Sequence, residues 1–455
     1  MSLSSLSPWT MAGAVLVSLA GLLGTLGWWQ RRCAPHPELV RKIAHVGMGL
    51  VTLTFPWIFR AVWPVWVLCA GSTALLAAAR WWRPLRPAMG GALGRVERAG
   101  AGEFYFTLSV ALVFTLAWGA DPAGVLFVVP MLVLTLADAV GALVGVRYGQ
   151  SRYTAGNGYK SVEGSLAFFI VAFFSTHVPL LLWAGAGRAE SLLIGTLLGL
   201  LVMLMEAVCG YGTDNLFVPL TSFVALRIYL DLDVPALALR LAVLAGLTAV
   251  LLVWRRRTYL DDSAPLAAAL VLYLCWSLGG WPWLVGPAAL LVTYTLLCAE
   301  SWLGSATLAR ARHKVDAVAC VASAGLVWLF VARTTHWGEV LRFPFTVAFA
   351  AHAGMIALAH LRDGNRRPAG GRVVAEAAAV AGALVLVPFV LLDAHGGAAG
   401  LWQLGVGGVA VAAATGAFAS WQERMDDCPT NTSRWLRQGV LGVASSLVGL
   451  SVPSA

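Results

Sequence analysis

Five acidic residues in the first half of the sequence lie inside or beside long apolar segments: Glu103, Asp138, Glu163, Glu206 and Asp214. Carboxylates are costly in a lipid bilayer, so those that occur there are usually functional. Basic residues that could neutralise phosphates lie near the same segments, among them Arg41, Lys42 and Lys160. Because carboxylates can hold Mg²⁺ and cations can hold phosphates, this combination is typical of phosphoryl transfer. The alternative is a set of ion pairs that anchor helix ends at the membrane surface.

Asp138 is the acidic residue with the most distinctive surroundings. Its segment, TLADAVGALVGVRYG, places Gly141, Gly145 and Gly149 on the same helical face as Asp138. A carboxylate above a track of glycines would allow a nucleotide to approach the backbone closely. A helix-packing face of small residues explains the glycines equally well, but it does not explain the aspartate.

A second candidate is the stretch Gly156-Asn157-Gly158, which predicts a flexible loop directly before Lys160. With Lys160 beside it, the loop could grip a phosphate, and Asn157 and Gly158 would then contact the nucleotide. An ordinary turn is the alternative. The stretch is not a Walker A motif, because the pattern GxxxxGKS is absent.

The elements that carry these residues are predicted to be membrane helices. Hydrophobic residues make up 59% of the chain and charged residues 12%, and the apolar residues form blocks of about 16–25, long enough to cross a bilayer. The sequence therefore predicts an all-α, polytopic integral membrane protein with about 16 membrane segments. The eighth segment is short and polar enough to be re-entrant. The segments are expected at 9–29, 42–59, 62–80, 103–119, 122–146, 164–184, 189–208, 215–231, 234–254, 264–280, 283–302, 315–333, 339–361, 373–393, 399–420 and 438–452.

The basic residues predict the orientation of these segments. If the loop after the first segment is cytoplasmic, most of the 31 Lys and Arg residues fall in cytoplasmic loops, as the positive-inside rule requires. The same threading places all five acidic candidates near the cytoplasmic face. The net charge of +9 is then a property of loops at a bilayer surface, and no nucleic-acid partner is expected. We expect a protein of the bacterial inner membrane with its active site facing the cytoplasm.

The chain is predicted to contain two membrane regions. The triple arginine at 255–257 and the pair Asp261-Asp262 suggest a boundary near residue 258. Residues 1–258 contain all the candidate site residues. Residues 259–455 form an additional helical membrane domain with no assigned function.

Five segments over about residues 35–225 together resemble a known family. They are RKIAHVGMG, GEFYFTLSV, LADAVGALVGVRYG, KSVEGSLAFF and EAVCGYGTDNLFVPL. In this order they are similar to the segments typical of the family of phytol kinase, dolichol kinase and CTP-dependent diacylglycerol kinase. The resemblance implies transfer of the γ-phosphoryl group of CTP to the hydroxyl of a membrane lipid alcohol, with Mg²⁺ as cofactor. The alcohol would be an isoprenoid such as phytol, geranylgeraniol or a polyprenol, or else diacylglycerol.

Read with this resemblance, the candidate residues receive roles. Catalysis is expected of Asp138, Lys160 and Glu206. Mg²⁺ is expected on Asp138, Asp214 and Glu103. Contacts to CTP are expected from Arg41, Lys42, Gly141, Gly145, Gly149, Asn157, Gly158 and Asn215.

Two other functions remain open. A cytidylyltransferase that makes a CDP-lipid would also use CTP and Mg²⁺, but its D-R-x-D signature is missing. A lipid or solute transporter would place acidic residues near the bilayer midplane, whereas these are predicted at one face.

Overall fold

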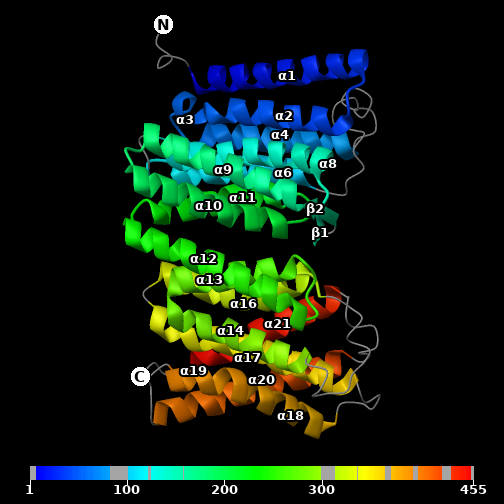
Figure 1. Cartoon of the computed structure of the whole chain (residues 1–455), viewed down its shortest axis with the longest axis vertical. Helices are drawn as coiled ribbons and strands as arrows, with labels where there is room; N and C mark the ends of the chain where they lie inside the picture. Colours follow the sequence, from blue (N-terminus) through cyan, green and yellow to red (C-terminus); the bar gives the residue numbers. More distant parts are fainter. Residues whose placement is uncertain are drawn as a thin grey trace. The chain divides into compact units, whose positions relative to one another are not determined.

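The computed structural model describes residues 7–81, 101–120, 124–156, 158–298, 313–335, 337–363, 370–392, 398–422 and 432–451. Nearly all of these residues are helical (Figure 1). Packing divides the chain into two units, Met1–Ala242 and Val243–Ala455. The division falls inside helix α12 (Val234–Trp254). The boundary predicted from the sequence, near residue 258, lies just beyond the end of that helix.

Each predicted membrane segment coincides with a helix or with successive helices. In the first unit these are α1 (Pro8–Cys33), α2 (Pro37–Leu53) with α3 (Phe55–Ile58), α4 (Trp63–Trp81), α6 (Gly102–Ala117), α7 (Val125–Leu132) with α8 (Asp138–Tyr148), α9 (Val162–Leu182), α10 (Arg188–Val208), α11 (Asp214–Tyr229) and the first part of α12. In the second unit they are α13 (Ala264–Gly279), α14 (Trp281–Cys298), α16 (Val315–Thr334), α17 (Gly338–Asp363), α18 (Gly371–Ala381) with α19 (Val387–Leu392), α20 (Ala398–Trp421) and α21 (Thr432–Val448).

The membrane character of these helices follows from their length and composition. Among the described residues, 9 helical stretches are long and apolar enough to cross a bilayer, and shorter apolar helices accompany them. Helices α2 and α11 fall below that standard because they have only 17 and 16 residues. The eighth predicted segment, α11, is one continuous helix. The prediction of an all-α polytopic membrane protein is confirmed.

Close packing of helices positions the candidate site in the first unit. Helix α9 packs against α8 and α10, α11 packs against α6 and α10, and α2 packs against α7 and α8. Fully buried side chains such as Phe127, Phe168 and Leu197 fill the spaces between these helices. Because lipid tails are as apolar as these side chains, close contact between helices must supply much of the stabilisation.

The helix that carries Asp138 is not a regular α-helix. Helix α7 contains Pro130, which has no N–H to donate, and a π-helical segment, η2 (Val133–Ala137), separates α7 from α8. A π-helix bonds residue i to i+5, and single π-helical turns occur frequently at functional sites. Asp138 is the first residue of α8, directly after this segment.

The loop predicted around Asn157 is a short β-hairpin. Strands β1 (Arg152–Ala155) and β2 (Gly158–Ser161) are antiparallel, and Tyr153 pairs with Lys160. Gly156 has φ of +49°, a conformation that favours glycine. A Cβ at Gly156 would also lie 2.9 Å from Gly210 Cα. Asn157 itself lies outside the described residues. The two strands give Lys160 a defined support, and the flexibility predicted for the loop at Asn157 stays a prediction.

The second unit is organised around helix α17. This helix packs against α14, α16, α18, α20 and α21, and its side chains, among them Phe345 and Phe349, are almost entirely buried. A helix that is apolar on all sides is expected at the centre of a bundle.

Candidate active site

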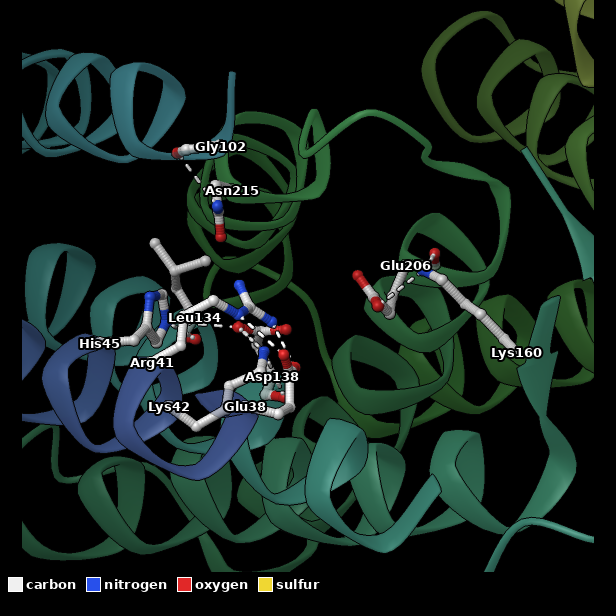
Figure 2. A network of polar contacts seen from close by, with 10 residues as sticks. All are labelled: Glu38, Arg41, Lys42, His45, Gly102, Leu134, Asp138, Lys160, Glu206 and Asn215. Carbon is white, nitrogen blue, oxygen red and sulfur yellow. Dashed lines mark hydrogen bonds and ion pairs between the residues drawn. The ribbon is translucent and has the colours of Figure 1, made fainter. Parts of the chain in front are cut away.

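Helix α2 brings an ammonium group to the carboxylate of Asp138 (Figure 2). Lys42 Nζ lies 2.7 Å from Asp138 Oδ2 and also donates to the backbone oxygen of Asp138 at 3.2 Å. The side chains of Lys42 and Asp138 are 3% and 13% exposed. Removing one member of a buried ion pair leaves an unbalanced charge and typically costs about 3–5 kcal/mol. The Lys42–Asp138 pair thus joins two predicted site residues that lie 96 residues apart in the sequence, and breaking it should destabilise the fold.

His45 is a third member of this group, and it was not among the predicted site residues. Its Nε2 lies 3.1 Å from the backbone oxygen of Leu134, in the π-helical segment, and 3.4 Å from Asp138 Oδ2. The Leu134 oxygen can only accept, so Nε2 carries the proton of this hydrogen bond and turns it towards the Asp138 carboxylate as well. The ring of Phe106 contacts His45 edge-on at 5.3 Å. The spacing in the sequence could have identified His45 as a site residue, because it follows Lys42 by three residues and so lies on the same helical face.

Arg41 lies beside this group but pairs within its own helix. Its guanidinium makes two hydrogen bonds to Glu38, Nη2 to Oε1 at 2.6 Å and Nε to Oε2 at 3.1 Å. The Arg41 side chain is 35% exposed. It is therefore the more accessible of the two basic residues that the sequence predicted in this helix.

The β-hairpin positions a second ammonium–carboxylate pair. Lys160 Nζ lies 2.6 Å from Glu206 Oε1 and also donates to the backbone oxygen of Glu206 at the end of α10 (Figure 2). The other oxygen, Glu206 Oε2, is buried and has no hydrogen-bond partner among the described residues. A buried carboxylate oxygen without a partner is costly, which points to a ligand or a substrate group at this position.

The charge state of Lys160 follows from its neighbours. Burial alone would lower the pKa of the Lys160 ammonium, but the negative charges of Glu206 and Asp214 outweigh it and raise the pKa above its usual value. Lys160 is therefore cationic at any physiological pH. It can neutralise phosphate oxygens as readily as it now neutralises carboxylates.

Three carboxylates from three helices converge between these two pairs. One oxygen each from Asp138 on α8, Glu206 on α10 and Asp214 on α11 lie within 4.8 Å of one another, and all three residues are partly buried. Carboxylate oxygens are the ligands that Mg²⁺ prefers, usually one or two of them together with substrate phosphates and water. The arrangement fits a divalent cation. It brings together three of the acidic residues that the sequence singled out.

Glu103 does not join this group. It lies in the first turn of α6 and is exposed. Its neighbour Gly102 is held instead by Asn215, whose Nδ2 donates to Gly102 O at 3.0 Å (Figure 2). Gly212, with φ of +83°, approaches so closely that a Cβ there would lie 2.7 Å from Gly102 Cα. The Asn215 amide fastens the start of α11 to α6, and the contact to CTP predicted for Asn215 stays a prediction.

The glycine track after Asp138 is a helix-packing face. A Cβ at Gly141 would lie 3.1 Å from the backbone oxygen of Gly164 on α9, and a Cβ at Gly145 would lie 3.2 Å from Ser161 Oγ. A Cβ at Gly149 would lie 2.7 Å from the same oxygen. The close approach of α8 and α9 accounts for the three glycines, and their predicted contacts to CTP stay a prediction. Gly158 is exposed with open space around it.

Comparison with known proteins points to a kinase. The chain is 29% identical over 216 residues to a phytol kinase from Synechocystis sp. (strain ATCC 27184 / PCC 6803 / Kazusa), a match that covers 47% of this chain and 89% of that protein. No family model matches the chain. No solved structure matches it. About half of the chain is thus similar to nearly the whole of a phytol kinase, which supports a family of the phytol kinase or lipid kinase type.

Proposed function

We propose that the first unit is a kinase that transfers the γ-phosphoryl group of CTP to the hydroxyl of a membrane lipid alcohol. The observation that carries this proposal is the convergence of three carboxylates and two lysines in a chain similar to a phytol kinase. An isoprenoid alcohol such as phytol, geranylgeraniol or a polyprenol is the proposed substrate, with diacylglycerol as the other lipid alcohol to test.

Asp138 and Asp214 are the proposed Mg²⁺ ligands. When bound, the cation would neutralise phosphate oxygens and help to position the nucleotide. The two aspartates lie on different helices, α8 and α11, so the packing of these helices sets the distance between the ligands. Glu206 lies within the same group, but we assign it to the lipid hydroxyl and not to the cation.

Lys42 and Lys160 are the proposed phosphate-binding cations. Each ammonium group has three N–H donors, and in this structure each uses two acceptors, one carboxylate oxygen and one backbone oxygen. A third donor on each lysine can therefore reach a phosphate without loss of the existing bonds. Charge neutralisation of this kind, built in advance, is usually the largest single contribution to catalysis.

Glu206 is the proposed acceptor for the proton of the lipid hydroxyl. Its Oε1 is held by Lys160, and its buried Oε2 has no protein partner among the described residues. A carboxylate fixed in this way can orient the hydroxyl and take its proton as the phosphoryl group is transferred.

The test of this proposal is a transfer assay with the purified protein, Mg²⁺ and a panel of phytol, geranylgeraniol, polyprenols and diacylglycerol. Label from γ-labelled CTP should appear in the lipid product, and label from α-labelled CTP should not. The reverse pattern would identify a cytidylyltransferase that makes a CDP-lipid. Absence of label from both nucleotides with every alcohol would contradict the kinase assignment.

Changing Asp214 to asparagine is expected to raise the Mg²⁺ concentration needed for half-maximal activity by at least about tenfold, because it removes one proposed metal ligand. The measurement is lipid phosphorylation across a Mg²⁺ titration. Asp231→Asn is the matched control, because Asp231 lies exposed just beyond the other end of α11. Glu103→Gln should also keep the wild-type requirement. An increase in that variant would instead support Glu103 as a metal ligand, as the sequence predicts.

A preference for CTP over ATP of at least about tenfold is expected, or roughly 1.4 kcal/mol in transition-state binding. The N4 amino group of cytosine needs an acceptor, and the backbone near Lys160 and Asp214, which both reach the carboxylate group, is the proposed source of one. A site built to bond such a group rejects analogues that lack it. Competition between the two nucleotides, followed as labelled lipid phosphate, measures the preference. Equal use of both would leave the kinase assignment intact but remove CTP as the specific donor.

The site is proposed to face the cytoplasm, and thiol labelling can test this orientation. Tyr159 in β2 is 74% exposed, and Ala184 is exposed just beyond the other end of α9, a helix about 30 Å long. In a chain with Cys33 changed to serine, Tyr159→Cys should resist a membrane-impermeant reagent added to intact cells. Ala184→Cys should react with it. The opposite pattern would place the site on the outer face.

A further inference from the structure

The side chains of helix α2 contact only one of the two carboxylate oxygens of Asp138 (Figure 2). Lys42 Nζ lies 2.7 Å from Oδ2, and His45 Nε2 lies 3.4 Å from the same oxygen. Neither contact involves the other oxygen, Oδ1. Oδ1 is therefore the oxygen that Asp138 can offer to a cation while both contacts persist.

The imidazole of His45 has a fixed direction in this arrangement. Its Nε2 donates to Leu134 O at 3.1 Å, and the ring of Phe106 meets it edge-on at 5.3 Å. His45 is buried. A carbonyl oxygen only accepts, so Nε2 carries a proton whether the ring is neutral or charged. The N–H group that faces Asp138 is thus held in place by packing and by a backbone bond.

Helix α2 comes close to the π-helical segment η2 because Gly49 lies one turn after His45. A Cβ at Gly49 would clash with the side chain of Thr135 in η2. Helix α2 packs against both η2 and α8. The bond from His45 to Leu134 therefore lies in a tight interface, four residues before Asp138.

Lys42 and His45 constrain the carboxylate in different ways. The Lys42 ammonium sits on a flexible stem with rotatable donors, so it can follow a carboxylate that turns. The terminal torsion of an aspartate is broad, and an ion pair with Lys42 alone would balance its charge without fixing its orientation. The ring of His45 cannot follow in this way, because its N–H is shared with Leu134 O. Its partly positive hydrogen also keeps a cation away from that side of Oδ2.

Divalent cations differ in how they use a carboxylate. Mg²⁺ demands near-ideal octahedral geometry at about 2.0–2.1 Å, whereas Ca²⁺ accepts roughly 6–8 oxygens at about 2.3–2.6 Å and can take both oxygens of one carboxylate. A carboxylate that offers one oxygen in a fixed direction suits Mg²⁺. A carboxylate that is free to turn and offer both oxygens suits Ca²⁺ better.

We propose that His45 is a positioning residue that limits Asp138 to binding through one oxygen and thereby selects Mg²⁺ over Ca²⁺. This inference rests on the proposed function, in which Asp138 and Asp214 hold the cation. His45 acts through Asp138 and does not itself contact the cation, the nucleotide or the lipid.

Cation binding to the purified full-length protein tests this role without a transfer reaction. Mn²⁺ is the probe, because it is paramagnetic and takes the same oxygen ligands as Mg²⁺ and Ca²⁺. Electron paramagnetic resonance measures free Mn²⁺ while either competitor is added. The readout is the Ca²⁺ concentration that releases half of the bound Mn²⁺, divided by the corresponding Mg²⁺ concentration. His45→Leu should lower this ratio by at least about tenfold, which corresponds to about 1.4 kcal/mol.

Two variants separate the N–H donor from the bulk of the ring. His45→Gln keeps a side-chain N–H donor and should keep the wild-type ratio. His177→Leu is the matched control, because the His177 ring also packs on a phenylalanine, Phe173 at 5.2 Å, towards the end of α9 away from the hairpin. It should keep the wild-type ratio as well.

The outcomes that would overturn the role of His45 are specific. If His45→Leu does not fold, His45→Met removes the same donor. An unchanged ratio in a folded variant without the donor would overturn the proposal. An equal fall in His45→Gln would assign the effect to packing and would also overturn it.

Asp214→Asn distinguishes failure of this inference from failure of the cation site itself. It should weaken Mn²⁺ binding, because it removes a proposed ligand. Wild-type protein that binds no Mn²⁺, or binds it as tightly as Asp214→Asn does, would overturn the cation site and with it the role of His45. Binding that depends on Asp214, with a ratio that does not depend on His45, would overturn the role of His45 alone and leave the proposed kinase standing.

Discussion

Replacing Asp138 with asparagine is expected to reduce lipid phosphorylation by about 10³-fold or more while the protein still inserts and folds. The amide has the shape of the carboxylate but lacks its charge, so it binds Mg²⁺ poorly and no longer balances Lys42. Losses of this size follow removal of a group that stabilises transition-state charge. The measurement is kcat for labelled lipid phosphate, with thermal unfolding of the purified variant recorded in parallel.

The buried Lys42 charge requires its own control in this experiment. Asp138→Asn leaves the Lys42 ammonium with neutral partners, which should lower the unfolding temperature. Adding Lys42→Met removes that charge and should restore part of the stability but none of the activity. If activity returned with stability, Asp138 would be a structural partner of Lys42 and not a metal ligand. Near-normal turnover of the single variant would remove Asp138 from the mechanism.

Replacing Glu206 with glutamine is expected to lower kcat by about 10²–10⁴-fold, the usual contribution of a general base. The amide can still accept a bond from Lys160, so the hairpin should remain attached to α10. Its other atom can no longer take a proton from the lipid hydroxyl. The Mg²⁺ concentration for half-maximal activity should change little, which separates this variant from Asp214→Asn.

Glu190→Gln is the matched control for Glu206→Gln, because Glu190 lies in the first turn of the same helix, at its opposite end. It should retain wild-type kcat. Rescue of Glu206→Gln by high Mg²⁺ would show that Glu206 is a metal ligand instead of the proton acceptor.

The fold was largely predictable because membrane helices are coded by composition. Runs of apolar residues separated by basic loops locate each helix to within a few residues, and no tertiary information is needed. The exceptions are local. The π-helical segment Val133–Ala137 and the hairpin that carries Lys160 depend on how α7, α8 and α9 pack, and a predicted helix or loop does not contain that information.

The kind of chemistry at the site could be predicted from the sequence, but not every residue that belongs to it. Asp138, Glu206 and Asp214 were singled out because acids are costly beside membrane segments, and the structure brings them together. Glu103 met the same criterion but lies exposed in the first turn of α6. The difference is the direction in which each side chain leaves its helix, and spacing within one helix cannot show that. For the same reason, spacing could not tell that Gly141 and Gly145 face α9.

The π-helical segment before Asp138 has a consequence for changes in chain length. In most membrane helices, deletion of one residue rotates everything beyond it by about 100° and turns a buried face towards lipid. A π-helical turn already holds one residue more than an α-helical turn. Deletion of one residue within Val133–Ala137 can therefore be absorbed by closure into an uninterrupted α-helix, with both flanks still in register. Such a shortened chain would keep its membrane topology but change the carbonyl that meets His45. Insertions and deletions here would act on the site without disrupting the bundle.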